Sequence, residues 1–120
     1  MLPLYNYHIL FKVCKPLRGK YQLSVACFLV LNGAYLYSVI LGKPFTSYAL
    51  LKFVTYYNNV KIGSYIRVLI ERNFITLAGA TKRSENLYTI SETGIQVIKE
   101  LNESYQEQLI IFCNKYNIEL

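Results

Sequence analysis

The sequence has 120 residues, enough for one domain with a hydrophobic core, and its 53% hydrophobic content excludes an intrinsically disordered chain. The formal net charge of +6 is unevenly placed. Residues 1–70 contain eight Lys or Arg and no acidic residue, and the first of the seven glutamates is Glu71. A basic half of this kind favours a polyanion or an anionic membrane surface as partner, although a basic face that is only solvated has the same composition.

Catalytic and metal-binding chemistry has little support. The chain has no Asp, a single His and no Gly-rich phosphate loop, and a pair of His8 with Cys14 lacks a third group. Cys14, Cys27 and Cys113 are far apart and odd in number, which is typical of reduced thiols in a cytoplasmic protein rather than of disulfides or a zinc site. We therefore expect a cytoplasmic protein without enzyme activity, metal or cofactor. Residues 1–8 also lack the basic start of a signal peptide.

The N-terminal residues predict a short helix or an extended arm. Apolar side chains in residues 5–17 have helical spacing, and Pro16 and Gly19 predict a break after them. Residues 1–22 are therefore interpreted as an arm that precedes the main domain.

The next segment, residues 23–41, carries no charge and is long enough to span a membrane. Asn32-Gly33 interrupts its middle, and the apolar faces of the remaining chain need a central partner. These features favour a buried core helix that begins near Ser24 and is ended by Gly42.

The middle of the chain predicts two helices separated by a turn. The first is capped by Thr46 or Ser47 and ends near Tyr56, and Asn58-Asn59 is a turn signal. The second runs over residues 60–72, with polar side chains on one face. Its apolar face contains Ile62, Ile66, Leu69 and Ile70.

A β-hairpin and a long helix follow. Asn73 suits the left-handed position that ends a helix, and residues 74–78 and 87–90 predict two strands. Ser91 or Thr93 can cap a final helix that continues to about residue 116.

The final helix has an apolar stripe that is longer than a small domain can cover. We expect its last part to pack against a second subunit, with residues 5–17 covering some of the same surface. Residues 23–98 are interpreted as the main domain and residues 99–120 as a dimerisation extension. The stripe consists of Ile95, Ile98, Leu101, Tyr105, Leu109, Phe112 and Tyr116.

Two segments resemble the winged helix-turn-helix family, especially the MarR-like transcriptional regulators. Leu69-Ile70-Glu71-Arg72-Asn73-Phe74-Ile75 is similar to the family's Leu-x-x-x-Gly-Leu-Ile, with Asn73 in place of Gly. Leu87-Tyr88-Thr89-Ile90-Ser91-Glu92-Thr93-Gly94 is similar to its Tyr-x-Leu-Thr-x-x-Gly. The resemblance implies a fold that is mainly α with a small β-hairpin (α+β), a long C-terminal dimerisation helix, and sequence-specific binding of double-stranded DNA by a homodimer.

With this fold, residues 59–72 would enter the major groove and residues 76–90 would contact the backbone or minor groove as a wing. The candidate DNA-binding residues are Asn58, Asn59, Lys61, Ser64, Tyr65, Arg67, Lys82 and Arg83. The candidate dimer residues are Tyr105, Leu109, Phe112 and Tyr116.

Two other functions fit the same sequence. One is a winged-helix module that binds proteins without DNA, and the other is a small membrane-anchored protein that spans at residues 23–41. The basic first half favours DNA over the protein module. The sequence identifies no small-molecule effector, although a regulator of this kind can have one.

Overall fold

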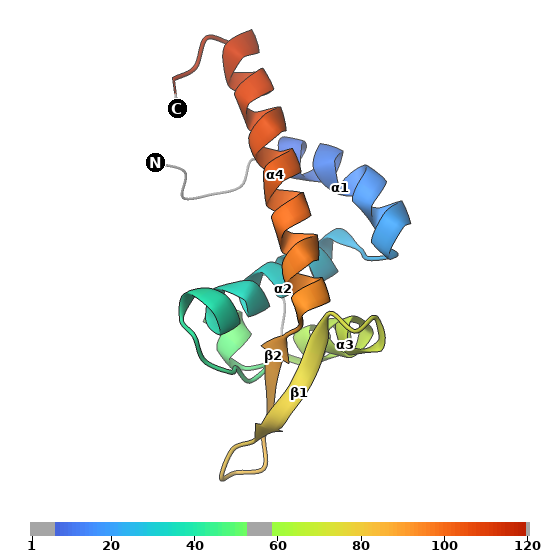
Figure 1. Ribbon diagram of the computed structural model, residues 1–120, viewed down its shortest axis with the longest axis vertical. Helices are drawn as coiled ribbons and strands as arrows, with labels where there is room; N and C mark the ends of the chain where they lie inside the picture. The colour runs from blue at the N-terminus through green and yellow to red at the C-terminus, as the bar shows by residue number, and fades with distance from the viewer. Residues whose placement is uncertain (1–6, 53–58, 120) are drawn as a thin grey trace. The chain divides into compact units, whose positions relative to one another are not determined.

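The computed structural model describes residues 7–52 and 59–119, which form two compact units. Residues 1–25 with residues 99–120 make up the first, called here the helical unit, and residues 26–98 make up the second, the winged unit. The described residues contain four α-helices and one antiparallel hairpin (Figure 1), so the predicted class, mainly α with a small β-hairpin, is confirmed.

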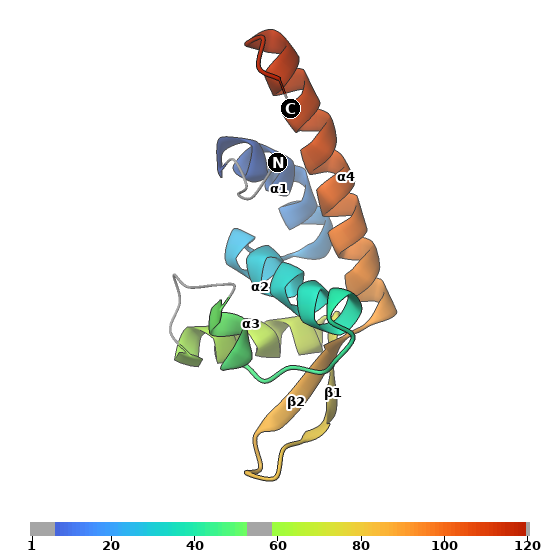
Figure 2. The same ribbon diagram turned by 90° about the vertical axis from the view of Figure 1, so that its left-hand side faces the viewer.

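In the helical unit, α1 (Tyr7–Tyr21) lies beside the later part of α4 (Glu92–Lys115), as Figures 1 and 2 both show. Buried residues recur every three or four positions along both helices, which is the spacing of a single helix face. The α1 face consists of Ile9, Leu10, Val13, Cys14 and Leu17, and the α4 face of Leu101, Tyr105, Leu109 and Cys113.

The predicted break at Pro16 and Gly19 is wrong, because α1 continues through both residues to Tyr21. Proline in a helix interior costs about 3 kcal/mol, since it has no N–H to donate. Both residues lie on the exposed side of α1, where water can solvate the freed carbonyl group. Burial of the opposite apolar face offsets the remaining cost.

Two polar contacts join the C-terminal end of α1 to α4. Lys20 Nζ lies 2.8 Å from Glu100 Oε1, and the Tyr21 hydroxyl donates to the other carboxylate oxygen. The hydrogen bond from Lys20, followed by that from Tyr21, lowers the pKa of Glu100. Within the same unit, burial raises the pKa of the Cys14 thiol to about 11, so this thiol is neutral at physiological pH and packs as a small apolar group.

The core of the winged unit is built on α2 (Val25–Tyr35), which a π-helical turn η1 (Leu36–Ile40) extends. A 3₁₀ turn η2 (Ala49–Lys52) and α3 (Asn59–Glu71) follow. The predicted central helix is therefore a core element, and Gly42 ends it in the left-handed conformation with φ +67°. The buried residues of α2 are Cys27, Phe28, Val30, Leu31, Gly33 and Ala34. Among the described residues, no single helix is long and apolar enough to cross a membrane; α1 and α2 meet that criterion only together, as a bent pair.

The second predicted helix is only partly described. The Thr46 hydroxyl accepts a hydrogen bond from the Ala49 amide at 3.2 Å, as a capping residue does. The turn that follows is 3₁₀ rather than α-helical over the residues of η2, and residues 53–58 lie outside the described part of the chain.

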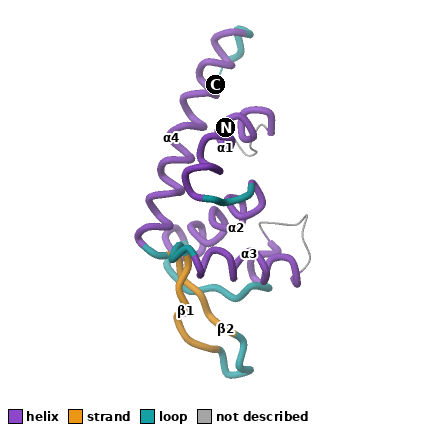
Figure 3. Tube along the Cα trace, turned by 90° about the vertical axis from the view of Figure 1, so that its right-hand side faces the viewer, coloured by secondary structure: helices purple, strands orange, loops and turns teal. Residues whose placement is uncertain are grey.

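The hairpin (Figure 3) pairs β1 (Ile75–Ala80) with β2 (Asn86–Ile90) in antiparallel register. A bulge falls between Leu77 and Gly79. The other edge of β2 is also paired. Phe45 and Tyr88 exchange two backbone hydrogen bonds of 3.0 and 2.8 Å, and the Ile90 amide donates to Ser38 Oγ of η1 at 3.0 Å. The hairpin is thus braced against the core at its base.

The end of α3 is locked to the start of α4. Asn73 has φ +63°, and the amides of Asn73 and Phe74 bond back to the carbonyls of Ile70 and Leu69, which is the Schellman arrangement. The hydroxyls of Ser91 and Thr93 both donate to the Asn73 carbonyl, at 2.6 and 2.7 Å.

Ser91 is the cap of α4. Its Oγ accepts a hydrogen bond from the Gly94 amide at 3.0 Å, while its own amide donates to the Phe74 carbonyl. Gly94 lies directly against that carbonyl. A Cβ added at residue 94 would overlap the Phe74 oxygen and would lie 2.8 Å from Cγ1 of Ile90.

This packing predicts that Gly94→Ala lowers the free energy of unfolding by about 1–3 kcal/mol, because the backbone of the α3–β1 junction must move to admit a methyl group. Gly63→Ala is the matched control, since a Cβ there meets nothing within 4 Å. It is expected to raise stability by about 0.5–1 kcal/mol in the middle of α3. Denaturant unfolding of both variants measures the difference, and equal stabilities would contradict the close packing at Gly94.

Candidate nucleic-acid interface

One face of α3 is open to solvent from Val60 to Glu71. Ile62, Ile66 and Leu69 are buried in the winged unit. On the opposite side, Val60, Ser64 and Arg67 are exposed and follow each other at intervals of four and three residues, so they form one line along the helix. Glu71, also exposed, continues this line in the last turn.

The polar groups along this line differ in what they can offer a ligand. Ser64 Oγ donates to the Val60 carbonyl at 3.2 Å, which leaves its lone pairs free to accept. Arg67 carries five donors and Lys61, which is also exposed, carries three. Tyr65 is half-buried at the margin of the face.

The structure does not describe the side chains of two predicted DNA-binding residues. Asn58 lies outside the described residues, and Asn59 is the first residue of α3 but its side chain is not described. Their contact with DNA stays a prediction, as it does for the exposed residues of α3.

Sequence reasoning missed Val60 and Gly63. Val60 is 79% exposed on this face, and Gly63 leaves an open space beside the line. The available signal was their position, since Val60 precedes Ser64 by four residues and Gly63 precedes Arg67 by four.

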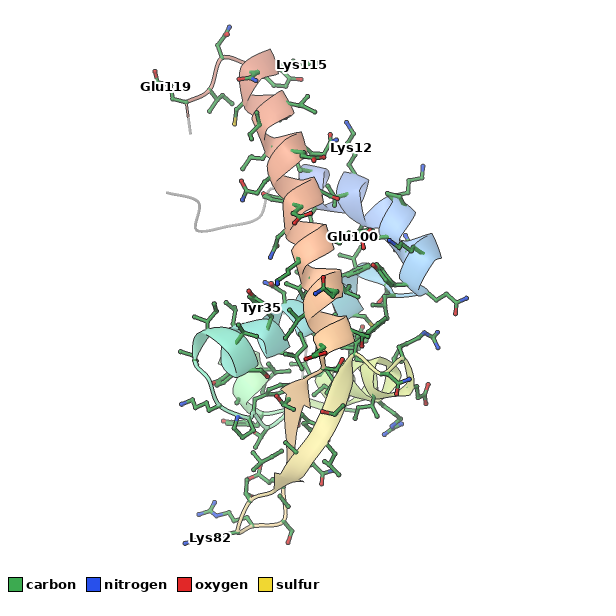
Figure 4. All side chains as sticks on the ribbon, in the orientation of Figure 1. Lys12, Tyr35, Lys82, Glu100, Lys115 and Glu119 are labelled. Carbon is green, nitrogen blue, oxygen red and sulfur yellow. The ribbon has the colours of Figure 1, made fainter. Side chains whose placement is uncertain are left out.

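The tip of the hairpin is organised by Thr81. Its hydroxyl accepts hydrogen bonds from the amides of Arg83 (3.2 Å) and Glu85 (3.1 Å), and its backbone bonds to Ser84 and Glu85. Ser84 takes the left-handed conformation with φ +63°. This turn presents the exposed Lys82 and Arg83 at the end of the hairpin, where Figure 4 shows Lys82.

Part of the apolar stripe of α4 is already buried within the subunit, whereas the sequence predicts a stripe that is open to a partner. Tyr105 and Leu109 are only 5% and 6% exposed, because this face is buried within the helical unit, where α1 lies alongside. Phe112 is half-buried and Tyr116 is exposed, and their ring centroids lie 4.8 Å apart. The exposed apolar side chains near the end of the chain are Ile110, Ile111, Tyr116 and Ile118.

Several solved structures share this architecture. MepR, a transcription regulator of the Staphylococcus aureus multidrug efflux pump MepA, matches with a TM-score of 0.73 over 91% of this chain and 76% of its own, at 13% identity. Staphylococcus aureus MarR in complex with salicylate and kanamycin matches with a TM-score of 0.73 over 94% of this chain and 72% of its own, at 17% identity. A MepR–DNA complex matches with a TM-score of 0.69 over 91% and 77%, at 12% identity.

The chain has a MarR-like winged-helix fold. The predicted winged helix-turn-helix fold is therefore confirmed. No protein-family profile and no curated protein matches the sequence.

The hydrogen bonds of Thr81 predict that Thr81→Val loosens the tip of the wing, because two backbone amides lose their acceptor. Amide hydrogen exchange at Arg83 and Glu85 is expected to accelerate, with little change in α3. Thr76→Val, in the exposed part of β1, is the matched control. Unchanged exchange at both amides would show that the hydroxyl does not hold the turn.

Proposed function

We propose that this protein is a cytoplasmic transcriptional regulator that binds double-stranded DNA as a homodimer, with α3 in the major groove and the hairpin on the backbone or minor groove. The observation that carries the proposal is the exposed line of α3, which presents Arg67 and Ser64 opposite a fully buried face. A reading helix needs this division between core and groove. The fold is that of regulators, and MepR has been solved with DNA.

The side chains on α3 suit different features of a base pair. Arg67 and Lys61 can donate to the two acceptors of guanine, and Ser64 can accept from an amino group of adenine or cytosine. Val60 can contact the methyl group of thymine. Asn58 and Asn59 precede these residues and are suited to adenine.

The wing supplies contacts that are independent of sequence. Lys82 and Arg83 lie at the exposed turn that Thr81 organises, where they can reach phosphates or a narrow minor groove. A protein-binding module would not need adjacent cations there or an acid-free stretch of 70 residues.

Replacing both wing cations in Lys82→Ala with Arg83→Ala should weaken binding to every duplex by a similar factor. The slope of log affinity against log salt should also become shallower, by about 0.9 for each phosphate that the wing no longer neutralises. Arg67→Ala is the contrasting variant, since removing a bidentate base contact should cost about 1–3 kcal/mol at one base pair and relax the preference there. Fluorescence anisotropy over a salt series measures both effects, and an unchanged slope in the double variant would remove the wing from the interface.

Dimerisation in this proposal uses the exposed apolar end of α4. Ile110 and Ile111 are 47% and 57% exposed, and with Tyr116 and Ile118 they form an apolar surface near the end of the helix. Phe112 and Tyr116 belong to the predicted dimer residues, whereas Tyr105 and Leu109 would support the surface from within the subunit. A two-fold dimer sets two reading helices on successive turns of a palindromic site.

The variant Ile110→Glu with Ile111→Glu is expected to give folded monomers, because it places charges in the interface without disturbing buried residues. Gln96→Glu adds an acid to an exposed position of the same helix and should leave the dimer intact. Sedimentation equilibrium at micromolar concentration separates the two cases. A wild-type monomer under these conditions would contradict the proposed dimer, and with it the expectation of a palindromic site.

A further inference from the structure

The outward face of α1, in the helical unit, carries a row of cations. Lys12, Lys15 and Arg18 are exposed, and they follow each other at intervals of three residues, opposite the buried face of α1. Figure 4 shows Lys12 projecting from the ribbon of α1. Lys20, at the end of the same helix, is held by Glu100.

The first three cations are not neutralised in the described part of the chain. Among the described residues, the ion pair found is that between Lys20 and Glu100, and none of the other three cations lies within ion-pair distance of a described carboxylate. Residues 1–70 contain no acid that could pair with them locally. The row therefore presents three unshared positive charges on one helix face.

Only small side chains lie between these cations on the surface of α1. Pro16 and Gly19 are exposed on the same side, and a Cβ added at Gly19 would meet nothing within 4 Å. Next to them, an open pocket is lined by Arg18, Gly19 and Gln22, together with Leu23 and Ser24. A polyanion can approach this surface closely, with the long side chains of Lys and Arg reaching to either side.

The chemistry of the face favours nucleic acid over a membrane. A helix that lies in a bilayer surface inserts large apolar side chains next to its cations. Ile9, Leu10, Val13 and Leu17 of α1 are instead buried within the helical unit. Successive cations are spaced by about 4.5 Å along the helix axis, which suits the closely spaced phosphates of a duplex.

We propose that the outward face of α1 is a second binding surface for the phosphate backbone of duplex DNA, formed by Lys12, Lys15 and Arg18. The proposal rests on the function proposed above, because it assumes that the protein binds DNA. The added contact is independent of base sequence. Its cations belong to the helical unit, whereas Lys82 and Arg83 belong to the hairpin.

The test is a salt series on the full chain with Lys12→Gln, Lys15→Gln and Arg18→Gln, singly and together. The triple variant should bind random duplex and a selected site more weakly by the same factor, and its salt slope should be shallower by up to about 2.7, or about 0.9 per cation. Lys20→Gln is the matched control. It changes the net charge by the same amount as each single variant, but the charge that it removes is already shared with Glu100, so its slope should stay near the wild-type value.

The outcomes separate this inference from the proposed function. If the wild type binds DNA and the triple variant keeps its slope, the α1 surface is overturned and the wing and α3 remain as the interface. If the wild type binds no duplex at low salt, both proposals fail. A triple variant that keeps its DNA slope but no longer binds phosphatidylserine vesicles would overturn the inference in favour of a membrane surface. Circular dichroism and thermal melting check that the exposed substitutions leave the fold intact.

Discussion

The winged unit depends on one small junction, where the last turn of α3, the base of the hairpin and the first turn of α4 meet. The Asn73 carbonyl accepts hydrogen bonds from two hydroxyls, and the Phe74 carbonyl accepts the Ser91 amide while packing against Gly94. These contacts satisfy backbone groups that a helix end leaves without partners. They also set the direction in which β1 leaves α3, so the position of the hairpin relative to α3 is determined here.

The edge of β2 that faces the core explains why α2 continues into the π-helical turn η1. A regular helix would carry residues 36–40 in steps of about 100° each, whereas η1 is wound as a π-helix and places Ser38 Oγ within 3.0 Å of the Ile90 amide. Phe45 pairs with Tyr88 on the same edge. Because both sides of β2 are hydrogen-bonded near its base, only the outer part of the hairpin is left free to carry Lys82 and Arg83 toward a ligand.

Features that depend on local chemistry can be predicted from the sequence, and features that depend on packing cannot. Asn73 and Gly42 are recognisable as helix ends because few other residues adopt positive φ, and the structure has both in that conformation. Pro16 misleads the same reasoning, since its cost is local but the burial that offsets it is not. The spacing of Tyr105 and Leu109 reveals an apolar face, yet spacing cannot say whether that face meets α1 or a second subunit.

The acidic residues show how the charge of the chain is organised. Glu100 neutralises Lys20, and Glu92 lies in the first turn of α4, where a carboxylate interacts favourably with the helix dipole. Glu71 has neither role. It lies in the last turn of α3, where the dipole disfavours an acid, and it follows Arg67 on the exposed line. In the proposed complex this carboxylate would repel a phosphate, so the contact face of α3 would end at Arg67. The alternative is that Glu71 accepts a hydrogen bond from the amino group of a cytosine. In that proposed complex, the acid at this end of α3 would therefore limit how the helix lies in the groove.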